Sequence, residues 1–245
     1  IMTEKIQLIL NSKTANEYIN NMTTDCIFKI PQMDIKRRHK AFISLTDAVI
    51  PHAFYNVNST NDKLNYTLNG VEYNLIITHA NYNINTLIAY LKANLAVGFN
   101  LVYHSPTNKI TFSHSTYDFV LLNSSSCFEL LGFYDNNSYS SVSLELISII
   151  GVNFFTIRNV QIASPNFILN NINSSTPNKA SIITSVPVNS SMGGIISYNN
   201  INNISSLIHE ISNINNLHIQ ILDQDGDLLD LNGLHYSINL LLTIE

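Results

Sequence analysis

Histidine is the residue whose spacing most often reveals a metal site or an acid–base pair, and this chain has eight of them. None stand in a His-x-His, His-x-x-x-His or His-Glu-x-x-His pattern, the spacings that place two ligands on one strand or one helical face. His104 and His114 flank a predicted hairpin and could face each other, although such pairs are more often surface neighbours. A metal site would need ligands from distant strands, and we predict neither a metal nor a cofactor.

Acidic residues gather between positions 223 and 230 in a pattern that resembles the start of a calcium loop. An EF-hand needs glycine at its sixth position and glutamate at its twelfth. Counted from Asp223, those positions hold Leu228 and Leu234, so a solvated turn is the favoured interpretation. No Gly-x-Ser-x-Gly elbow and no phosphate-binding glycine pattern occurs. We therefore predict that the protein is not an enzyme.

One concentrated basic run, residues 36–40, could bind a polyanion with a salt-dependent affinity. The chain as a whole has a net charge of −5, and no aromatic residue interrupts the run. A solvated loop or a contact with acidic groups of a neighbouring subunit is therefore favoured over nucleic acid. The candidate residues for a polyanion or subunit contact are Lys36, Arg37, Arg38 and Lys40.

Composition limits the class of protein. At 245 residues the chain can form one large β domain or two small domains. Apolar residues make up 45% and charged residues only 12%, which favours a large core and a lightly charged surface. Cys26 and Cys127 cannot build a disulfide framework, so we expect buried free thiols in a reducing compartment. We expect no secretory signal and no membrane span, because no stretch approaches roughly 20 apolar residues.

The elements that must position these residues are mostly strands. Residues 236–244 alternate apolar and polar side chains, as do residues 4–10, and we expect the two ends of the chain to lie together in one β-sandwich. Glycines at 226 and 233 suit tight hairpin turns before the last strand. Further expected elements are strands at 25–30 (ended by Pro31), 41–50 (ended by Pro51), 152–162, 182–188, 195–198 and 217–221, and a helix at 204–211.

The middle of the chain, from residue 55 to residue 133, has a different texture. Its best helix signal covers residues 84–95, with Asn83 or Asn85 as N-cap and Gly98 as the stop. The other expected elements are hairpins at 64–77 and 99–114, a strand at 119–122, and a short helix from a Ser124–Ser126 cap to Gly132. We interpret this stretch as a subdomain inserted into the surrounding β structure.

Four stretches, taken in their order along the chain, carry a resemblance to a known family. They are Phe42–Asn58, which contains Ile-Pro-x-x-Phe-Tyr-Asn-Val-Asn; His79–Leu91, which contains Asn-Tyr-x-x-x-x-Leu at a predicted helix start; Cys127–Phe133; and Asp230–Ile238 with the closing strand. Together they extend from residue 42 to residue 245, and their order and spacing resemble the penton, or minor capsid, proteins of virophages, Polinton-like viruses and their giant-virus relatives. In the second stretch His79-Ala80 stands where the family's Gly-Asn-Tyr-x-x-x-x-Leu helix start usually has glycine.

The resemblance implies a mainly β protein. Its single jelly-roll β-sandwich would comprise residues 1–54 and 141–245, with a small α+β subdomain inserted at residues 55–140. It also implies a structural virion protein, the penton subunit, that forms a homopentamer at icosahedral five-fold vertices. Its partners would be further copies of itself, a double jelly-roll major capsid protein, and a fibre or receptor. The protein would reside in the virion capsid and assemble in the host cytoplasm or a viral factory.

Two alternatives remain open at this stage. One is another capsid-associated role, such as a spike-base protein. The other is a jelly-roll module that binds a glycan or a receptor, for which Tyr82, Tyr134 and Tyr139 could offer stacking surfaces. Aromatic residues near turns are more often packing anchors.

Overall fold

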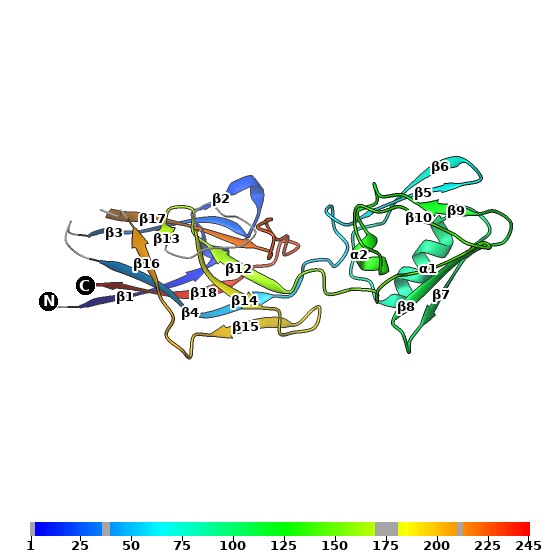
Figure 1. Ribbon diagram of the computed structural model, residues 1–245. Coiled ribbons are helices and arrows are strands. Elements are labelled where there is room, and N and C mark those ends of the chain that lie inside the picture. The colour runs from blue at the N-terminus through cyan, green and yellow to red at the C-terminus, as the bar shows by residue number, and fades with distance from the viewer. Residues whose placement is uncertain (1–2, 36–39, 170–180, 210–212) are drawn as a thin grey trace. The chain divides into compact units, whose positions relative to one another are not determined.

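The structure is a computed structural model that describes residues 3–35, 40–169, 181–209 and 213–245 (Figure 1). The chain divides into two compact units. Unit 1 comprises Ile1–Phe54 and Ile157–Glu245, and unit 2 comprises Tyr55–Thr156. Each unit has its own cluster of buried apolar side chains.

The first sheet of unit 1 brings the two ends of the chain together. Every position pairs along these two end strands, from Glu4 opposite Ile244 to Asn11 opposite Ser237. This confirms the prediction that the first and last strands lie side by side. In spatial order the strands are β1 (Glu4–Asn11), β18 (Ser237–Ile244), β4 (Ala41–Pro51), β16 (Ser206–His209) and β13 (Ile168–Leu169), with β15 (Ile195–Asn199) also paired to β4.

The second sheet of unit 1 is also antiparallel. Its strands, in spatial order, are β14 (Ile182–Pro187), β12 (Asn159–Ala163), β17 (Asn213–Leu222), β3 (Asp25–Asp34) and β2 (Glu17–Tyr18). Two short 3-10 turns, η1 (Ser12–Thr14) and η2 (Ile19–Asn21), flank β2. Along the sequence the chain passes from one sheet to the other and back, so that β1, β4 and β18 lie in the first sheet and β3, β12 and β17 in the second. This is the single jelly-roll β-sandwich that we predicted.

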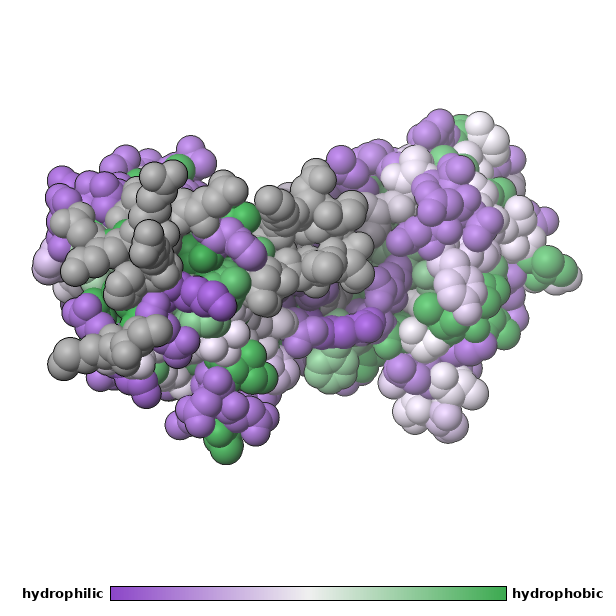
Figure 2. All heavy atoms as spheres, turned by 60° about the vertical axis from the view of Figure 1, so that its left-hand side comes forward, coloured by the Kyte–Doolittle hydropathy of each residue, from purple (hydrophilic) through white to green (hydrophobic). Residues whose placement is uncertain are grey.

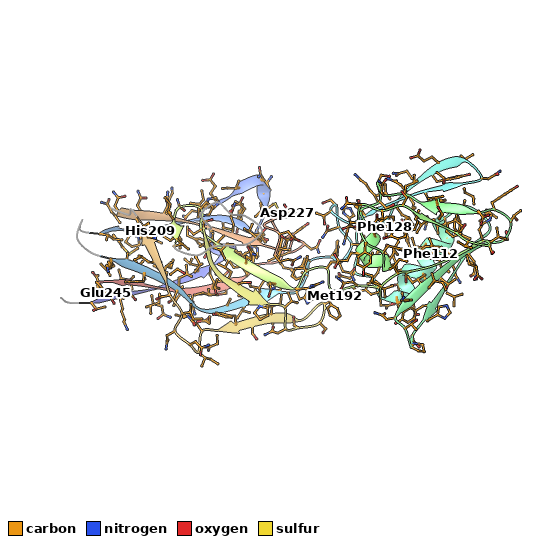
Figure 3. The ribbon with its side chains drawn as sticks, in the orientation of Figure 1. Phe112, Phe128, Met192, His209, Asp227 and Glu245 are labelled. Atoms are coloured by element: carbon orange, nitrogen blue, oxygen red, sulfur yellow. The ribbon has the colours of Figure 1, made fainter. Side chains whose placement is uncertain are left out.

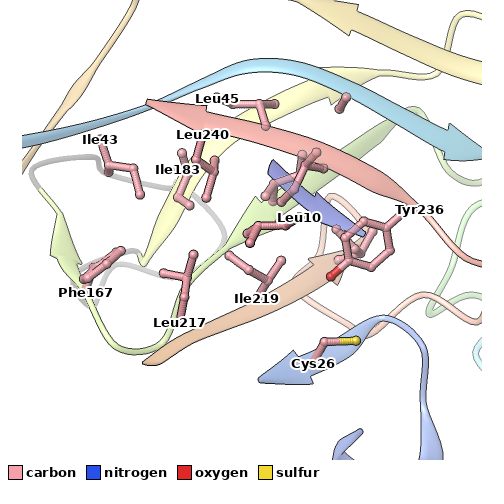
Figure 4. Close-up of a cluster of buried hydrophobic side chains, with 14 of the residues drawn as sticks. Leu10, Cys26, Ile43, Leu45, Phe167, Ile183, Leu217, Ile219, Tyr236 and Leu240 are labelled. Atoms are coloured by element: carbon pink, nitrogen blue, oxygen red, sulfur yellow. The ribbon is translucent and has the colours of Figure 1, made fainter. Parts of the chain in front are cut away.

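The core of unit 1 is formed by the facing sides of its two sheets. In β18 the side chains alternate between partly exposed and buried over the whole strand, as the sequence pattern requires. Figure 4 shows Ile43, Leu45 and Leu240 from the first sheet gathered with Leu217 and Ile219 from the second. The alternation thus places one row of each strand in the core and the other row outside.

Unit 2 is the α+β unit. Figure 3 shows Phe112 and Phe128 in its interior. Both predicted hairpins are confirmed, as β5–β6 and β7–β8. One sheet has the order β10 (Tyr139–Ser140), β9 (Phe119–Leu121), β5 (Lys63–Leu68), β6 (Val71–Ile76); the other has the order β11 (Glu145–Ile147), β8 (Lys109–His114), β7 (Phe99–His104); the helices are α1 (Ile84–Asn94) and α2 (Phe128–Leu131).

Helix α1 begins at a capping box. The Asn83 side chain accepts hydrogen bonds from the backbone N–H groups of Asn85 and Thr86, and the Thr86 hydroxyl oxygen accepts one from the Asn83 N–H. Of the two caps predicted, the structure therefore selects Asn83. The helix ends at Asn94, before Gly98, which lies in the following turn at φ +106°.

Replacing Asn83 by alanine should lower the free energy of unfolding of unit 2 by about 1 kcal/mol, because two N–H groups lose their acceptor. Urea unfolding followed by circular dichroism would measure the loss. Asn85→Ala is the matched control, since the exposed Asn85 side chain makes no cap bond and alanine is the better helix former. Equal losses in both variants would contradict the assignment.

The far boundary of the insertion was predicted wrongly. We expected the jelly roll to resume at residue 141, but residues 141–156 belong to unit 2. β11 pairs with β8, and Val152 lies in the unit 2 core. The apolar run 152–162 is therefore no single strand, because Val152 packs in the core of unit 2 and Ile157 in the core of unit 1. The strand itself, β12, covers only Asn159–Ala163.

Three other local predictions are corrected by pairing across the sheets. Residues 204–211 were expected to be helical, but Ser206–His209 forms β16, because pairing with β4 supplies its backbone partners. The glycines at 226 and 233 do take positive φ, yet β17 and β18 form no hairpin, since they belong to opposite sheets. β3 continues past Pro31, where its register with β17 shifts at a bulge that accommodates the proline.

The cap of the short helix is the remaining correction. α2 begins after Cys127 without a side-chain cap, and it ends at Gly132 (φ +84°), as predicted. The serines expected to cap it are used elsewhere: the Ser125 and Ser126 hydroxyls accept hydrogen bonds from the N–H groups of Asn65 and Lys63. They thus join the helix to the neighbouring sheet.

Candidate interaction surface

The outer face of the first sheet in unit 1 carries a polar trough, and an interrupted strand creates it. β15 pairs with one end of β4 and β16 with the other, so together they take the place of one continuous strand. The intervening residues, 200–205, leave the sheet. The Asn200 side chain closes this excursion by bonding the backbone N–H and C=O of Ile204 (3.0 and 2.8 Å).

The trough has a volume of about 960 Å³. Its lining residues come from β1, β4, β18, the end of β15, the excursion and the residues directly before β1 and after β18, and almost all of them are polar. Those that the structure describes are Thr3, Lys5, Gln7, Ser44, Thr46, Asp47, Asn199, Asn200, Asn203, Ser205, Leu241, Thr243 and Glu245. No aromatic side chain is among them.

Asp47 lines the trough, and hydrogen bonds hold its side chain in place. Its two carboxylate oxygens accept hydrogen bonds from the Asn239 amide (2.9 and 2.7 Å), and the Thr46 hydroxyl donates to one of them (3.3 Å). These residues sit at the bulge where the register of β4 against β18 shifts. The carboxylate therefore has its hydrogen-bonding partners already, and no histidine or cysteine among the described lining residues could act with it as a base or nucleophile. The arrangement suits binding through hydrogen bonds.

Large apolar side chains stand near this polar surface. Ile9 on β1 is 73% exposed, and Ile201 and Ile204 on the excursion are 83% and 63% exposed. Ile9 projects from the same face of the sheet as Asn239, its partner in β18. On the face visible in Figure 2, hydrophobic residues occur as separate patches among hydrophilic ones. Exposed isoleucines around a hydrogen-bonding surface are typical of a protein–protein contact.

The last residue of the basic run, Lys40, lies beside the trough. Lys40 is exposed, and its backbone exchanges two hydrogen bonds of 2.9 Å with Glu245, which lines the trough. Lys36, Arg37 and Arg38 lie outside the described residues. The acidic turn is remote: in Figure 3, Asp227 and Glu245 lie at opposite ends of unit 1. Lys40 is therefore remote from the acidic turn.

The acidic turn is organised by backbone hydrogen bonds. The Asp223 carboxylate accepts from the N–H groups of Asp225 and Asp227 (2.9 and 3.0 Å), as in an Asx turn. Burial raises the pKa of the Asp223 carboxyl, and these two N–H groups oppose the shift. The structure thus shows the turn that we favoured over a calcium loop.

His104 and His114 were the two histidines that could have faced each other. His104 and His114 do not face each other, because His104 pairs with Lys109 and His114 with Phe99 at opposite ends of the hairpin. His114 is buried, and its ring bonds the carbonyl of Val97 (3.1 Å). Among the described residues, no three His, Cys, Asp or Glu side chains come together as metal ligands do.

Two histidines instead pair with buried aspartates. His218 Nε2 lies 2.5 Å from Asp25 Oδ1 on the outer side of the second sheet in unit 1. His79 Nε2 lies 2.8 Å from Asp62 Oδ2 in unit 2. Sequence spacing gave no signal for either pair, because the partners come from different elements.

Both cysteines are buried free thiols. Burial raises the pKa of Cys26 from the ordinary 9.0 to about 11, and it raises the pKa of Cys127 further. Thiolates are therefore disfavoured in the folded protein, and neither thiol is placed to act as a nucleophile at neutral pH.

The raised pKa of Cys26 predicts a pH-dependent stability. The unfolded chain releases the Cys26 thiol proton at a lower pH than the folded chain does. The stability that the protonated thiol contributes is therefore fully present below about pH 9 and is lost as the pH rises towards about 11. Urea unfolding between about pH 8 and about pH 10.5 should show this decline. Cys26→Ala should lose less stability over the same range, and identical slopes would contradict the assignment.

Two of the three tyrosines proposed as stacking surfaces are packing residues. Tyr82 is buried, and its hydroxyl donates to the carbonyl of Thr78 (3.0 Å). The Tyr139 ring packs against Phe133 at 4.8 Å between centroids. Tyr134 alone of the three is exposed, at 54%.

Within the described part of the chain, no helix has the length and apolar character needed to cross a membrane.

No protein-family model matches the sequence, and no curated protein matches it. Solved structures do match. The mavirus penton protein is similar over 99% of this chain and 99% of its own, with a TM-score of 0.50 and 12% identity. A chain of the Sputnik virophage is similar over 98% and 97%, with a TM-score of 0.42 and 12% identity. At this identity the first likeness shows a shared fold.

Proposed function

We propose that the protein is a penton, a minor capsid subunit of which five copies form a capsomer at an icosahedral five-fold vertex. The observation that carries this proposal is the end-to-end likeness to the mavirus penton protein, which covers 99% of both chains and therefore both units. A chance jelly roll would be expected to match over the sandwich alone, without the insertion of about 100 residues between β4 and β12.

The subunit works through shape and contact rather than catalysis. A closed five-fold ring joins two different surfaces of each copy, and stable subunit interfaces bury roughly 2,000 Å² or more. The polar trough with its exposed isoleucines is the surface that we assign to one side of this contact. The partners are further copies of the chain, a double jelly-roll major capsid protein, and a fibre or receptor.

The protein acts in the virion capsid and assembles in the host cytoplasm or a viral factory. Light scattering and negative-stain imaging of the purified full chain test the ring. Pentamers, or monomers that assemble into five-fold rings as the concentration rises, are the expected result. A protein that stays monomeric at every concentration would contradict it.

The second candidate is a jelly-roll module that binds a glycan. The hydroxyl- and amide-rich lining of the trough favours this role. The absence of aromatic side chains among its described lining residues weighs against it, since aromatic faces commonly cover sugar rings. A monomer with measurable glycan affinity, lost on Asp47→Ala, would support this candidate over the ring.

Replacing Lys36, Arg37, Arg38 and Lys40 by serine should leave folding intact and weaken assembly or genome packaging. The change removes four positive charges and takes the net charge from −5 to −9. If the run contacts acidic groups of a neighbour, ring formation in the parent protein should weaken with added salt, and the variant should lose that dependence. A variant that fails to fold would show that the run has a structural role instead.

A further inference from the structure

Strand β6 (Val71–Ile76) lies at the edge of the four-stranded sheet in unit 2, with β5 as its neighbour (Figure 1). All of its side chains except that of Leu75 are exposed, on both faces of the sheet. The large apolar ones are Val71 (54% exposed), Ile76 (47%) and Tyr73 (38%). A strand of this kind leaves apolar surface and backbone groups in water.

Edge strands in soluble proteins usually carry a device that prevents further pairing, such as a lysine, a proline or a bulge. β6, with the sequence Val-Glu-Tyr-Asn-Leu-Ile, has neither lysine nor proline. Its register with β5 runs without a shift from Lys63 opposite Ile76 to Leu68 opposite Val71. By contrast, β1, an edge strand of unit 1, carries Lys5. β6 is therefore open to another strand.

The hairpin turn determines which backbone groups point outward. Asn69 and Gly70 both have positive φ, +50° and +75°, as in a two-residue type I′ turn. In that geometry Leu68 and Val71 exchange both of their hydrogen bonds, and the bonded pairs then alternate along the strands. Glu72 and Asn74 consequently direct their N–H and C=O groups away from β5.

The far side of β5 agrees with this alternation. Asn65, the partner of Asn74, uses its backbone groups on the side away from β6. Its C=O accepts from Leu122 N (2.8 Å), and its N–H donates to Ser125 Oγ (2.9 Å). Further along the edge, the Ile76 carbonyl is already bonded by the Tyr90 hydroxyl (3.1 Å). Among the described residues, none pairs with the four outward groups of Glu72 and Asn74.

We propose that β6 pairs antiparallel with β6 of a second copy of this chain, about a two-fold axis at Tyr73. Glu72 then lies opposite Asn74 of the other copy, and the two residues exchange both hydrogen bonds. The symmetry repeats this exchange, so all four outward groups are satisfied. The inference goes beyond the proposed capsid role and concerns unit 2 alone.

Side-chain chemistry selects this register. On the inner face Tyr73 meets its own copy and Val71 meets Leu75, so every pair is apolar; Tyr73 already stacks on Tyr66, with centroids 5.1 Å apart. On the outer face each Glu72 carboxylate meets an Asn74 amide, which donates one N–H to Asn65 Oδ1 of its own sheet and can donate the other to the carboxylate. The matching of apolar with apolar and of acceptor with donor argues for a second copy as the occupant.

Neighbouring registers are worse. An axis at Glu72 would place two carboxylates directly opposite each other, which is destabilising. An axis at Asn74 would place Glu72 opposite Ile76, whose carbonyl is already bonded by Tyr90. The Tyr73 axis avoids both conflicts.

A two-fold contact cannot close a five-fold ring, so it joins copies that belong to different rings or copies that are free. A contact of one strand edge is small, and it should be weak between single copies. Five such edges on one ring, facing five on another, would bind with much higher avidity. The expected species are weak dimers of single copies and, where rings form, pairs of rings.

Cysteine cross-linking of the full chain tests the axis. In Tyr73→Cys the two Cα atoms would lie roughly 4.5 Å apart, within disulfide range, and mild oxidation should give a covalent dimer. Val71→Cys is the matched control, because its two copies would lie roughly 13 Å apart along the strands. Both native cysteines are buried and should not interfere. Equal cross-linking by the two variants, or none by Tyr73→Cys, would overturn the proposal.

A charge exchange tests the register. Asn74→Asp places a carboxylate opposite each Glu72 and should weaken self-association about tenfold by sedimentation. Adding Glu72→Lys should restore or strengthen it, because the introduced ammonium group of one copy then faces the introduced carboxylate of the other. Failure of this rescue would overturn the register.

The same measurements separate this inference from the penton proposal. Rings that show no β6-dependent pairing would sink the inference and leave the penton proposal standing. Dimers that depend on β6, without any rings, would contradict the penton proposal and leave the inference standing. Cross-linking only to another protein would reject a second copy as the occupant.

Discussion

Replacing Leu240 by alanine should lower the free energy of unfolding of unit 1 by about 2–5 kcal/mol. Leu240 is fully buried at the centre of β18, between Leu8 of β1 and Leu45 of β4, and it points at the second sheet. Alanine would leave a cavity that the strands on either side cannot close, because their backbones are held by hydrogen bonds. Urea unfolding of the purified variant would measure the loss.

The adjacent residue provides the control. Leu241 has the same chemistry and lies on the same strand, but it points outward into the trough and is only partly covered. Leu241→Ala should therefore cost less than about 1 kcal/mol. Equal losses in the two variants would mean that the sandwich does not have the two-layer packing described above.

Replacing Gly132 by alanine should destabilise unit 2 by about 3 kcal/mol. Gly132 ends α2 with φ +84°, a conformation that costs energy for any residue with a Cβ. A Cβ at this position would also collide with the carbonyl oxygen of Ile150 and lie 3.1 Å from the Ser148 side chain. The Gly132 carbonyl accepts from Ile150 N (2.9 Å), so the two segments cannot separate without losing that bond.

Gly70→Ala isolates the contribution of the backbone. Gly70 has a similar φ of +75°, but nothing lies within 4 Å of its added Cβ. Its variant should lose only about 1 kcal/mol. A loss as large as that of Gly132→Ala would show that the clash with Ile150 has little effect.

Together these variants address the division of the chain. If the two units unfold separately, calorimetry should show two transitions, with Leu240→Ala lowering one and Gly132→Ala the other. We propose this independence because the two apolar clusters share no residue. A single transition that both variants lower equally would contradict it.

Much of the fold could be predicted from the sequence because much of it depends on local rules. The alternation of β18 and the amphipathic spacing of α1 are set by strand and helix periods, which the residue pattern carries directly. Asn69-Gly70 and Gly132 take positive φ because few other residues tolerate it. The family resemblance, also read from the sequence, led to the jelly roll and the inserted unit.

The candidate site could not be predicted in the same way. The trough depends on the break between β15 and β16, and the sequence pattern at residues 204–211 favoured a helix instead. Whether the backbone N–H and C=O groups of Glu72 and Asn74 point away from β5 depends on the register in which β6 pairs with β5. The spacing of side chains along the sequence predicts neither the break between β15 and β16 nor the free edge of β6. The break arises from pairing between strands that are distant in sequence, and the free edge from the absence of such pairing.

By itself, the sequence determined where most of the strands and turns form, since these follow from side-chain period and backbone freedom within a few residues. Only the tertiary structure decided that β17 and β18 enter opposite sheets, that the insertion ends after Thr156, and that the trough lies beside Glu245. An apolar run such as 152–162 signals burial but not the core in which each residue is buried. That choice is made by contacts between segments that the chain itself keeps far apart.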